Sequence, residues 1–402
     1  MKDILSGKKI ILGITGCIAA YKACLIAREL VLRGAEVKTV MTPSALEFIT
    51  PLTLSALTQN DVVVNTFPGN QANGVSSSTW HVDTALWADL MLIAPATVNT
   101  VAKLAAGFAD NALLTLALAL RCPLIVSPAA DVDMYQNPAS QLNIKKLESL
   151  GIHVVPAEEG KLASGLSGKG RLPEIEKIIL SVESVLSGYN KDFKDQNLLI
   201  TAGPTFEDID PVRFIGNRSS GKMGFQLAKA AFIRGANVTL ITGPSSLSTF
   251  QGIRTISVRS AEEMKNAVDA EFTNNAALIM AAAVADYRPE LIADHKIKKE
   301  EGLSSVNLVK TTDILASLNK GDKKIIGFAL ETNDETENAL KKLNSKNLDM
   351  IVMNSLQEKG SGFETETNKV TIFSRSGGKI ELPLQSKFQI ANQILSEVKK
   401  VL

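Results

Sequence analysis

The chain has few of the residues that carry disulfide or metal chemistry, and almost no excess charge. Its 402 residues include three cysteines and three histidines, and its formal net charge at pH 7 is +1. The cysteines show neither CxxC spacing nor histidine-rich surroundings, which fits a reducing compartment. A balanced charge gives no reason to expect a nucleic acid or a membrane surface as partner. We therefore expect small molecules as substrates and partners.

Long apolar runs and targeting signals are also lacking. The apolar run at residues 112–120 is interrupted by Arg121 and is shorter than the roughly 20 residues that cross a bilayer as a helix. The N-terminus lacks the basic and apolar regions of a signal peptide. We therefore expect a cytoplasmic protein.

The length and an internal repeat indicate two domains. A chain of 402 residues is too long for one core, because single cores stop growing near ~250–300 residues. The same unit of strand, glycine turn, helix, Arg-Gly-Ala and strand occurs twice, beginning at residues 9–16 (KIILGITG) and 197–203 (NLLITAG). A polar segment at 187–196 separates the copies. We predict domains at 1–190 and 191–402.

Alternating apolar runs and helical stretches predict the fold class. The first half has runs at 10–14, 37–41, 90–94 and 124–126, with helical stretches at 18–33 and 98–120. The second half has runs at 198–202, 238–241, 278–282, 325–328 and 350–353, and then a hairpin pattern at 370–374 and 379–384. This alternation is typical of α/β folds, and predicts two doubly wound, Rossmann-like domains. Ligands of such sheets bind at the carboxyl ends of the strands.

The first glycine turn, residues 13–20 (GITGCIAA), is a candidate phosphate site. It places backbone N–H groups at the start of a helix, where an anion is favoured. A dinucleotide site adds an acidic residue after the second strand, whereas this strand ends at Met41, Thr42 and Pro43. The pattern favours a mononucleotide such as FMN over NAD. The same turn also occurs where a helix merely packs on a sheet.

His81 is a candidate acid–base residue. It lies beside Trp80, just before a helix predicted to end at Trp87. A histidine next to a tryptophan is usually structural. An imidazole titrates near pH ~6.5, however, so in the right surroundings it can move a thiol proton at neutral pH.

Several first-half segments together resemble the flavin-dependent cysteine decarboxylases. They are 16–22 (GCIAAYK), 48–52 (FITPL), His81, 87–90 (WADL), 94–97 (APAT) and 128–135 (PAADVDMY). The closest resemblance is to the decarboxylase half of the bifunctional phosphopantothenoylcysteine decarboxylase/phosphopantothenate–cysteine ligase family of coenzyme A biosynthesis. It implies a flavodoxin-like domain in which His81 is the base and FMN contacts Gly16, Cys17, Thr42, Ala94, Pro95, Ala96 and Thr97. In that family FMN oxidises the substrate thiol to a thioaldehyde, and loss of CO2 then leaves an enethiolate.

Two positions depart from the family pattern. Asp131 replaces an asparagine expected to hold the substrate carboxylate, and Ser164 replaces a cysteine expected to donate the final proton. Asp131 is either protonated in the closed site or contacts the substrate amide. A serine hydroxyl is far less acidic than a thiol of pKa near ~8.5, so the proton could instead come from Asp131, water or the flavin. Residues 165–170 have the glycine content of a flap or of a mobile surface loop.

The second half contains a near match to a P-loop at residues 216–223 (GNRSSGKM). Met223 occupies the place of the Mg2+-binding Ser or Thr, which excludes a Walker-type ATPase. What remains is an anion site at the start of a helix, or a capped helix with Lys222 in solvent.

Segments 201–205 (TAGPT), 210–224 (DPVRFIGNRSSGKMG), 281–287 (AAAVADY) and 296–299 (KIKK) resemble the ligase half of the same family. That family activates 4′-phosphopantothenate with CTP and Mg2+ as an acyl-cytidylate, which the cysteine amine then attacks. The resemblance implies that Asn217 meets the carboxylate. It assigns CTP to Met280, Ala281, Ala282, Asp286, Lys296, Thr312, Asp313, Ile314, Leu315, Phe328, Lys342 and Lys346.

The lysine assignments and the choice of nucleotide have different grounds. Lys342 and Lys346 are four residues apart and so share a helix face, but charge runs of this kind are usually solvated surface. The choice of CTP over ATP follows from the resemblance alone. The pattern assigns no protein ligands to the Mg2+.

We therefore predict a bifunctional enzyme of coenzyme A biosynthesis that ligates cysteine and then decarboxylates the product. One alternative is that Ser164 and Asp131 stall the flavin half at the enethiol. Another is that the flavin half is a regulatory binding module. A nicotinamide dehydrogenase is disfavoured by the missing ribose acid. The resemblance also implies a homo-oligomer, because the family's flavin sites lie between subunits and its ligase halves pair.

Overall fold

The computed structural model describes residues 4–67, 79–247, 252–298, 305–331, 335–355 and 365–402. The chain forms two compact units, Lys2–Tyr189 and Asn190–Leu402. In the described parts, no helix combines the length and apolar character that a bilayer crossing requires.

The first unit is built on a six-stranded parallel sheet in the order β3-β2-β1-β4-β5-β6. Its strands are β1 (Lys9–Ile14), β2 (Glu36–Met41), β3 (Val62–Val63), β4 (Leu90–Ala96), β5 (Leu124–Pro128) and β6 (His153–Val154). This is the Rossmann order, and without the two-residue edge strand β3 it becomes the flavodoxin-like order 2-1-3-4-5. The predicted doubly wound fold is confirmed.

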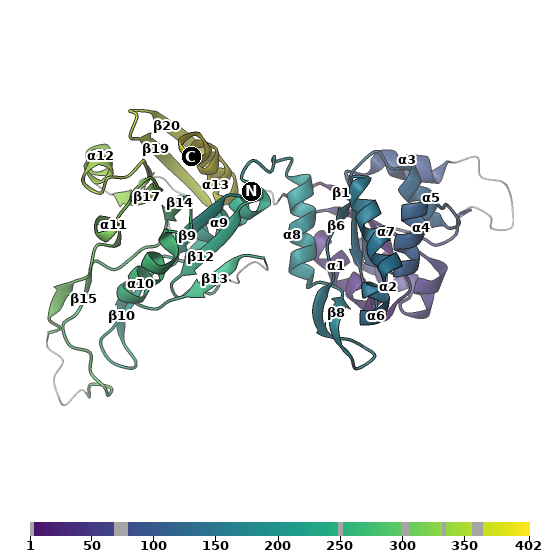
Figure 1. The fold of residues 1–402 in the computed structure, drawn as a ribbon, viewed down its shortest axis with the longest axis horizontal. Helices are drawn as coiled ribbons and strands as arrows, with labels where there is room; N and C mark the ends of the chain where they lie inside the picture. The colour runs from purple at the N-terminus through teal and green to yellow at the C-terminus, as the bar shows by residue number, and fades with distance from the viewer. Residues whose placement is uncertain (1–3, 68–78, 248–251, 299–304, 332–334, 356–364) are drawn as a thin grey trace. The chain divides into compact units, whose positions relative to one another are not determined.

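Helices cover both faces of this sheet (Figure 1). Successive strand residues point to opposite faces, so Ile10 and Leu12 belong to one core and Ile11 to the other. The first core contains α1 (Tyr21–Leu32), α2 (Pro51–Thr58) and α8 (Ile175–Leu186), and the second contains α3 (Trp80–Trp87), α4 (Val98–Ala106), α5 (Ala112–Ala119) and α7 (Pro138–Ser149). With both faces covered, the central strands β1 and β4 are almost entirely buried and apolar.

The second unit repeats this plan with two added strands. The order is β13-β12-β9-β14-β17-β18-β19-β20, and β19 and β20 pair antiparallel at the edge, as the hairpin pattern predicted. The strands are β9 (Asn197–Ala202), β12 (Asn237–Thr242), β13 (Arg254–Ser257), β14 (Ala277–Met280), β17 (Lys324–Glu331), β18 (Met350–Ser355), β19 (Thr367–Ser374) and β20 (Lys379–Ser386).

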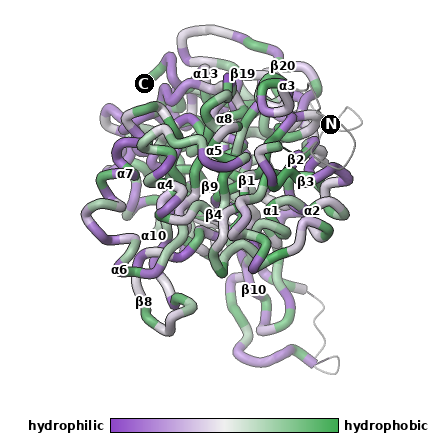
Figure 2. Tube along the Cα trace, turned by 90° about the vertical axis from the view of Figure 1, so that its right-hand side faces the viewer, coloured by the Kyte–Doolittle hydropathy of each residue, from purple (hydrophilic) through white to green (hydrophobic). Residues whose placement is uncertain are grey.

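Its two cores also lie on opposite faces of the sheet. One contains α9 (Lys222–Ile233) and α13 (Lys387–Val401), and the other contains α10 (Ala261–Phe272), α11 (Ile314–Ser317) and α12 (Glu335–Ser345). Figure 2 shows hydrophobic segments gathered along central strands such as β1 and β9, and many hydrophilic stretches on outer loops. Short antiparallel pairs complete the chain: β7 (Glu158–Lys161) with β8 (Ser167–Arg171), β10 (Phe206–Asp208) with β11 (Phe214–Gly216), and β15 (Tyr287–Pro289) with β16 (Leu308–Lys310).

Two local predictions were wrong. The helical stretch predicted at 98–120 is two helices, because α4 ends at Gly107 in the left-handed conformation (φ 75°) and α5 begins at the N-cap Asn111. The side chain of Asn111 accepts a hydrogen bond from the N–H of Leu114 at 3.0 Å. His81 lies in the first turn of α3 rather than before the helix.

The repeated Arg-Gly-Ala marks the same turn in both units. Arg33 and Arg234 end α1 and α9, and the glycines that follow have φ of 84° and 91°. Each arginine is held by an acid: Arg33 Nη2 lies 2.8 Å from Glu183, and Arg234 Nη2 lies 2.5 Å from Asp192. The hydrogen bond from Arg234 is the main reason that the pKa of Asp192 is lowered.

The glycine in this turn should be needed for stability. We expect Gly34→Ala to lower the free energy of unfolding by about 1–2 kcal/mol, because a Cβ is strained in the left-handed region. Gly34→Asn should cost less, since asparagine tolerates this conformation. Both tryptophans, Trp80 and Trp87, lie in the first unit, so urea unfolding followed by their fluorescence reports on it. Equal stability of Gly34→Ala and wild type would contradict this account.

Candidate active sites

The first unit contains a cavity of about 1010 Å³ at the carboxyl ends of its strands. Its walls come from the turn after β1, the loops after β2, β4 and β5, and the β7–β8 hairpin. Among the predicted site residues, Gly16, Cys17, Thr42, Thr97, Asp131 and Ser164 line it. Ala94, Pro95 and Ala96 belong to β4 and are buried rather than part of the lining.

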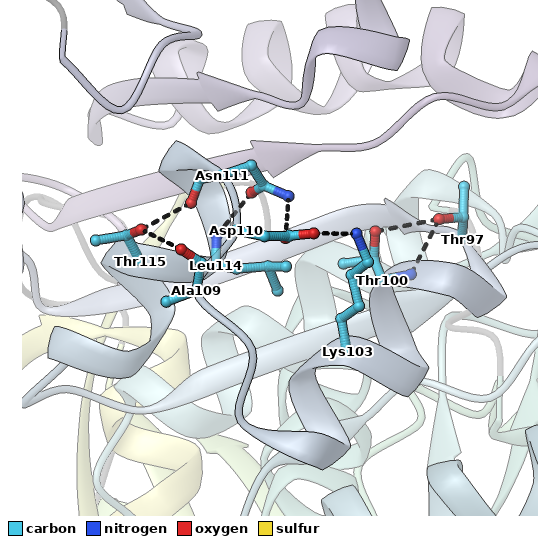
Figure 3. Close-up of polar contacts among 8 residues, drawn as sticks. All are labelled: Thr97, Thr100, Lys103, Ala109, Asp110, Asn111, Leu114 and Thr115. Carbon is cyan, nitrogen blue, oxygen red and sulfur yellow. Dashed lines mark hydrogen bonds and ion pairs between the residues drawn. The ribbon is translucent and has the colours of Figure 1, made fainter.

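A buried threonine hydroxyl fixes the floor of this cavity. Thr15 is 1% exposed, and its Oγ1 donates to the carbonyl of Pro95 at 2.8 Å and accepts from the N–H of Thr97 at 2.9 Å. The two bonds tie the end of β1 to the loop after β4. Thr97 in turn caps α4, since its hydroxyl accepts from the N–H of Thr100 (Figure 3).

Beside this threonine, the glycine turn packs closely on the loop after β2. A Cβ on Gly16 would lie 2.5 Å from the carbonyl oxygen of Ser44, so no side chain fits there. Burial raises the pKa of the neighbouring Cys17 thiol, which makes it a poor nucleophile. Thr42 Oγ1 is buried and has no hydrogen-bond partner among the described residues. A buried hydroxyl of this kind in the cavity lining is suited to a polar ligand.

Charged side chains also line this cavity. Lys103 of α4 contacts Asp110, and Asp110 also accepts a hydrogen bond from Asn111 (Figure 3). Lys22 lies 3.8 Å from Glu174, and Arg171 contacts the same carboxylate. The lining therefore carries cations that an anionic ligand could reach.

Asp131 and Ser164, the two residues that differ from the family pattern, both line the first cavity. The N–H of Ala130 donates to the carbonyl of Gly170 at 3.0 Å, which joins the hairpin to the loop before Asp131. Ser164 is exposed on the turn of the hairpin. Asp131 is the N-cap of α6 (Val132–Gln136), but its carboxylate makes no capping hydrogen bond. Both groups therefore remain available to a ligand.

His81 is not among the residues that line this cavity. Its ring packs edge-on against Trp80, with centroids 5.8 Å apart, and Trp80 Nε1 donates to the carbonyl of Thr66 at 2.8 Å. The side chain is half-buried on α3. The structure does not bring the predicted base together with Asp131 and Ser164 within one unit.

The second unit contains a cavity of about 690 Å³. It is lined by the predicted residues Asn217, Met280, Ala281, Ala282, Asp286, Thr312, Asp313, Ile314, Leu315, Phe328, Lys342 and Lys346. Thr201 corresponds to Thr15 of the first unit. Its Oγ1 accepts a hydrogen bond from the N–H of Ala282, in the loop after β14, at 3.1 Å. Asn217 Nδ2 donates to the carbonyls of Ala283 and Val284 at 3.0 and 3.3 Å.

An ion pair fixes one wall of the second cavity. Lys346 Nζ lies 2.9 Å from Asp313, whose side chain also caps α11. Burial acts to raise the pKa of Asp313, but the Lys346 ammonium and the backbone N–H groups outweigh it, so that the pKa is lowered. The carboxylate therefore stays ionised at neutral pH.

Lys296 is exposed and lies outside the cavity lining, and Lys299 of the same motif lies outside the described residues. The segment is held by Asp210 and Arg213: Arg213 Nη2 donates to the carbonyl of Ile297 at 2.9 Å, and the N–H of Ile297 donates to Asp210 at 3.3 Å. The hydrogen bond from Arg213 holds the pKa of Asp210 well below its usual range.

No group of three or more His, Cys, Asp or Glu side chains in the described part of the chain is placed to hold a metal ion.

Comparison with known proteins matches the two halves of the chain to two families. Residues 2–187 match the flavoprotein family, and residues 193–402 match the family described as DNA/pantothenate metabolism flavoprotein C-terminal domain. The coenzyme A biosynthesis bifunctional protein CoaBC of Bacillus subtilis (strain 168) is 43% identical over 399 residues, 98% of this chain and 97% of that one. This chain belongs to the family of coenzyme A biosynthesis bifunctional proteins.

Other relatives extend the comparison. The CoaBC protein of Escherichia coli (strain K12) is 40% identical over 403 residues, 98% of this chain and 97% of that one. A cysteine/cysteine sulfinic acid decarboxylase from an unknown prokaryotic organism is 48% identical over 357 residues, 87% of this chain and 98% of that one. The predicted family resemblance is confirmed, and the chain is an enzyme.

The family motifs did not reveal every residue of the second cavity. Lys310, Asn354, Asn368 and Lys387 also line it. Asn354 and Lys387 belong to β18 and α13, far along the chain from the motifs. The only signal for Asn354 was its place directly after the apolar run at 350–353, and no element was predicted at Lys387.

The Thr15 bridge gives a test of how the first cavity is built. We expect Thr15→Val to lower the free energy of unfolding by about 1–3 kcal/mol, because the buried N–H of Thr97 loses its acceptor. Thr15→Ser should be close to wild type, since it keeps the hydroxyl. Tryptophan fluorescence during urea unfolding measures both variants. A stable Thr15→Val together with a destabilised Thr15→Ser would show that the methyl group, not the hydrogen bonds, matters.

Proposed function

We propose that this enzyme makes 4′-phosphopantothenoylcysteine in residues 191–402 and decarboxylates it to 4′-phosphopantetheine in residues 1–190. The observation that carries the proposal is that each unit has its own cavity at the strand ends, lined by the motif residues of the corresponding half of the family. Because the bifunctional relatives match along almost the whole chain, a stalled or purely regulatory flavin half is not favoured.

The ligase step requires an activated carboxyl group, because a carboxylate is a poor electrophile. CTP with Mg2+ would supply the activation, with Asp286 and Thr312–Leu315 around the nucleotide and Lys342 and Lys346 near its phosphates. Asn217, already fixed by two backbone carbonyls, would orient the substrate carboxylate for attack on the nucleotide. The cysteine amine then displaces CMP from the acyl-cytidylate.

The first cavity fits FMN because Thr42, which lines it, has a buried hydroxyl that lacks a hydrogen-bond partner among the described residues. The same cavity is bounded by the turn of Gly16 before α1, and a phosphate is favoured at such a turn. FMN, when bound, supplies the hydride acceptor that turns the thiol into a thioaldehyde. Gly16, Cys17, Thr42 and Thr97 would hold it in place.

The remaining groups of the first cavity would handle substrate and protons. Asp131 is placed to contact the substrate, either as a protonated acid beside its carboxylate or as an acceptor for its amide. Ser164 on the hairpin covers the same space and would exclude water from the enethiolate. The cations Lys103 and Arg171 would attract the phosphorylated substrate.

A product assay tests the proposed function. We expect the purified protein, incubated with 4′-phosphopantothenate, cysteine, Mg2+ and CTP, to release CO2 and form 4′-phosphopantetheine, with ATP giving less product. Mass spectrometry identifies every species. A matched Ser164→Cys variant, which restores the more acidic thiol, should turn over at least as fast. Absence of acyl-cytidylate and of ligated product with either nucleotide would refute the proposal.

We further propose that His81 acts in the cavity of a second copy, because it does not line the cavity of its own unit. His81→Ala and Gly16→Val should each abolish CO2 release, the second because its side chain would strike Ser44. Co-expressed, the two variants should regain about a quarter of the activity or more, since mixed oligomers contain intact sites. No recovery in mixed oligomers, verified by differential tags, would place His81 and the flavin site in one chain.

A further inference from the structure

The second cavity holds two groups of cations that come from opposite faces of the sheet. Lys342 and Lys346 belong to α12, which covers one face. Lys222 and Lys387 are the first residues of α9 and α13, which cover the other. The family motifs assign the α12 pair to the nucleotide. They leave the second pair without a role.

Lys387 is buried to an unusual degree for a lysine. It is 4% exposed, and its ammonium donates to the carbonyl of Thr365 at 2.6 Å. Burial and, next, the charge of Lys222 lower the pKa of Lys387 to about 8, although Glu366 acts to raise it. Buried ammonium groups are costly, so a lysine kept beside a cavity calls for an anionic ligand.

Two amides stand next to this lysine pair in the cavity wall. Asn368 is 1% exposed, and its Oδ1 accepts from the N–H of Lys369 at 3.2 Å. Oδ1 of Asn354 is buried without a hydrogen-bond partner among the described residues. Because amide oxygen and nitrogen can exchange places by rotation, each amide can present an N–H to an anion.

The start of α9 adds backbone donors to the same wall. Its N-cap is Gly221, which makes no side-chain capping hydrogen bond, and Lys222, Met223 and Gly224 line the cavity. A helix N-terminus attracts anions. The N-terminus of α9 lines the same cavity as Lys222, Lys387, Asn354 and Asn368.

We propose that Lys222, Lys387, Asn354 and Asn368 form a phosphate-binding subsite of the ligase cavity, separate from the α12 lysines. The inference rests on the proposed function, in which two phosphorylated substrates, CTP and 4′-phosphopantothenate, share one cavity. Two sets of phosphate groups require two cationic walls. The phosphate bound here belongs either to the acyl substrate or to the triphosphate tail, and the chemistry of recognition is the same.

Glu366 would compete with a phosphate group for the ammonium of Lys222. Its Oε1 lies 2.5 Å from Lys222 Nζ, and its side chain is 78% exposed. An arriving phosphate would displace this carboxylate from Lys222, and the glutamate can turn into solvent without a burial cost. The Lys222–Glu366 pair therefore neutralises the subsite when phosphate is absent.

Steady-state release of pyrophosphate by the full chain tests the subsite. Lys387→Met and Lys222→Met should each raise one KM by about tenfold, corresponding to the loss of one charge-assisted hydrogen bond, with kcat changing less than KM. A raised KM for 4′-phosphopantothenate assigns the phosphomonoester, and a raised KM for CTP assigns the triphosphate. Glu366→Gln should lower the same KM, and Lys387→Arg should recover part of the loss.

Lys400→Met is the matched control, because Lys400 lies on the same helix with a side chain 67% exposed and pairs with Glu397 outside the cavity. It should change neither KM. Thermal unfolding checks that each variant is folded, and Lys222, being less buried than Lys387, keeps the test independent of packing. Both KM values within twofold of wild type in Lys222→Met and Lys387→Met would overturn the subsite.

Calorimetric titration with inorganic pyrophosphate separates this inference from the proposed function. If wild type releases no pyrophosphate from CTP, the proposed function fails, but the titration still decides the subsite. We expect wild type to bind pyrophosphate about tenfold more tightly than Lys222→Met and Lys387→Met. Equal affinities in all three proteins would refute the subsite.

Discussion

Helices cover both faces of the central sheet in each unit, so a ligand can reach the sheet at its strand ends. The hydroxyl of Thr15 fixes the loop after β4, and that of Thr201 fixes the loop after β14. In both units a buried threonine hydroxyl accepts a hydrogen bond from an N–H in the loop that follows the neighbouring strand. This bond fixes the backbone beside the glycine turn. The cavities, and the side chains around them, depend on this arrangement.

The two cavities differ in how they meet an anionic ligand. In the first, Lys103 and Lys22 are paired with carboxylates on neighbouring elements. In the second, Lys346 and Lys222 are paired as well, with Asp313 and Glu366, but the cations come from both faces of the sheet and include the deeply buried Lys387. The cavities therefore differ in where their cations stand, and cations on two walls suit the two phosphorylated substrates of the proposed ligase.

Sequence patterns predicted the parts of the structure that follow from local rules. Alternating apolar runs gave the strands, and the Arg-Gly-Ala repeat marked two helix ends with left-handed glycines. The residues that the family motifs predicted line the two cavities, except Lys296, His81 and the buried strand residues 94–96. The break at Gly107 was missed because residues 98–120 are rich in alanine and leucine, which favour a helix. A left-handed glycine and the asparagine cap at Asn111 outweigh that preference. Lys387 could not be found, because its burial depends on packing between segments distant in the chain.

Asp131 and Ser164, the two residues that differ from the family pattern, lie on segments that are joined to each other. The hydrogen bond from Ala130 to Gly170 joins the loop that carries Asp131 to the hairpin that carries Ser164, so both face one cavity. An ionised carboxylate only accepts hydrogen bonds, so it would have to meet a donor of the substrate, such as the amide. A protonated carboxyl group would instead donate to the substrate carboxylate, as the replaced amide would. Because one hydrogen bond joins the two segments, the substrate contact of Asp131 and the position of Ser164 over the cavity are set together, and the source of the final proton has to be sought with both residues in view.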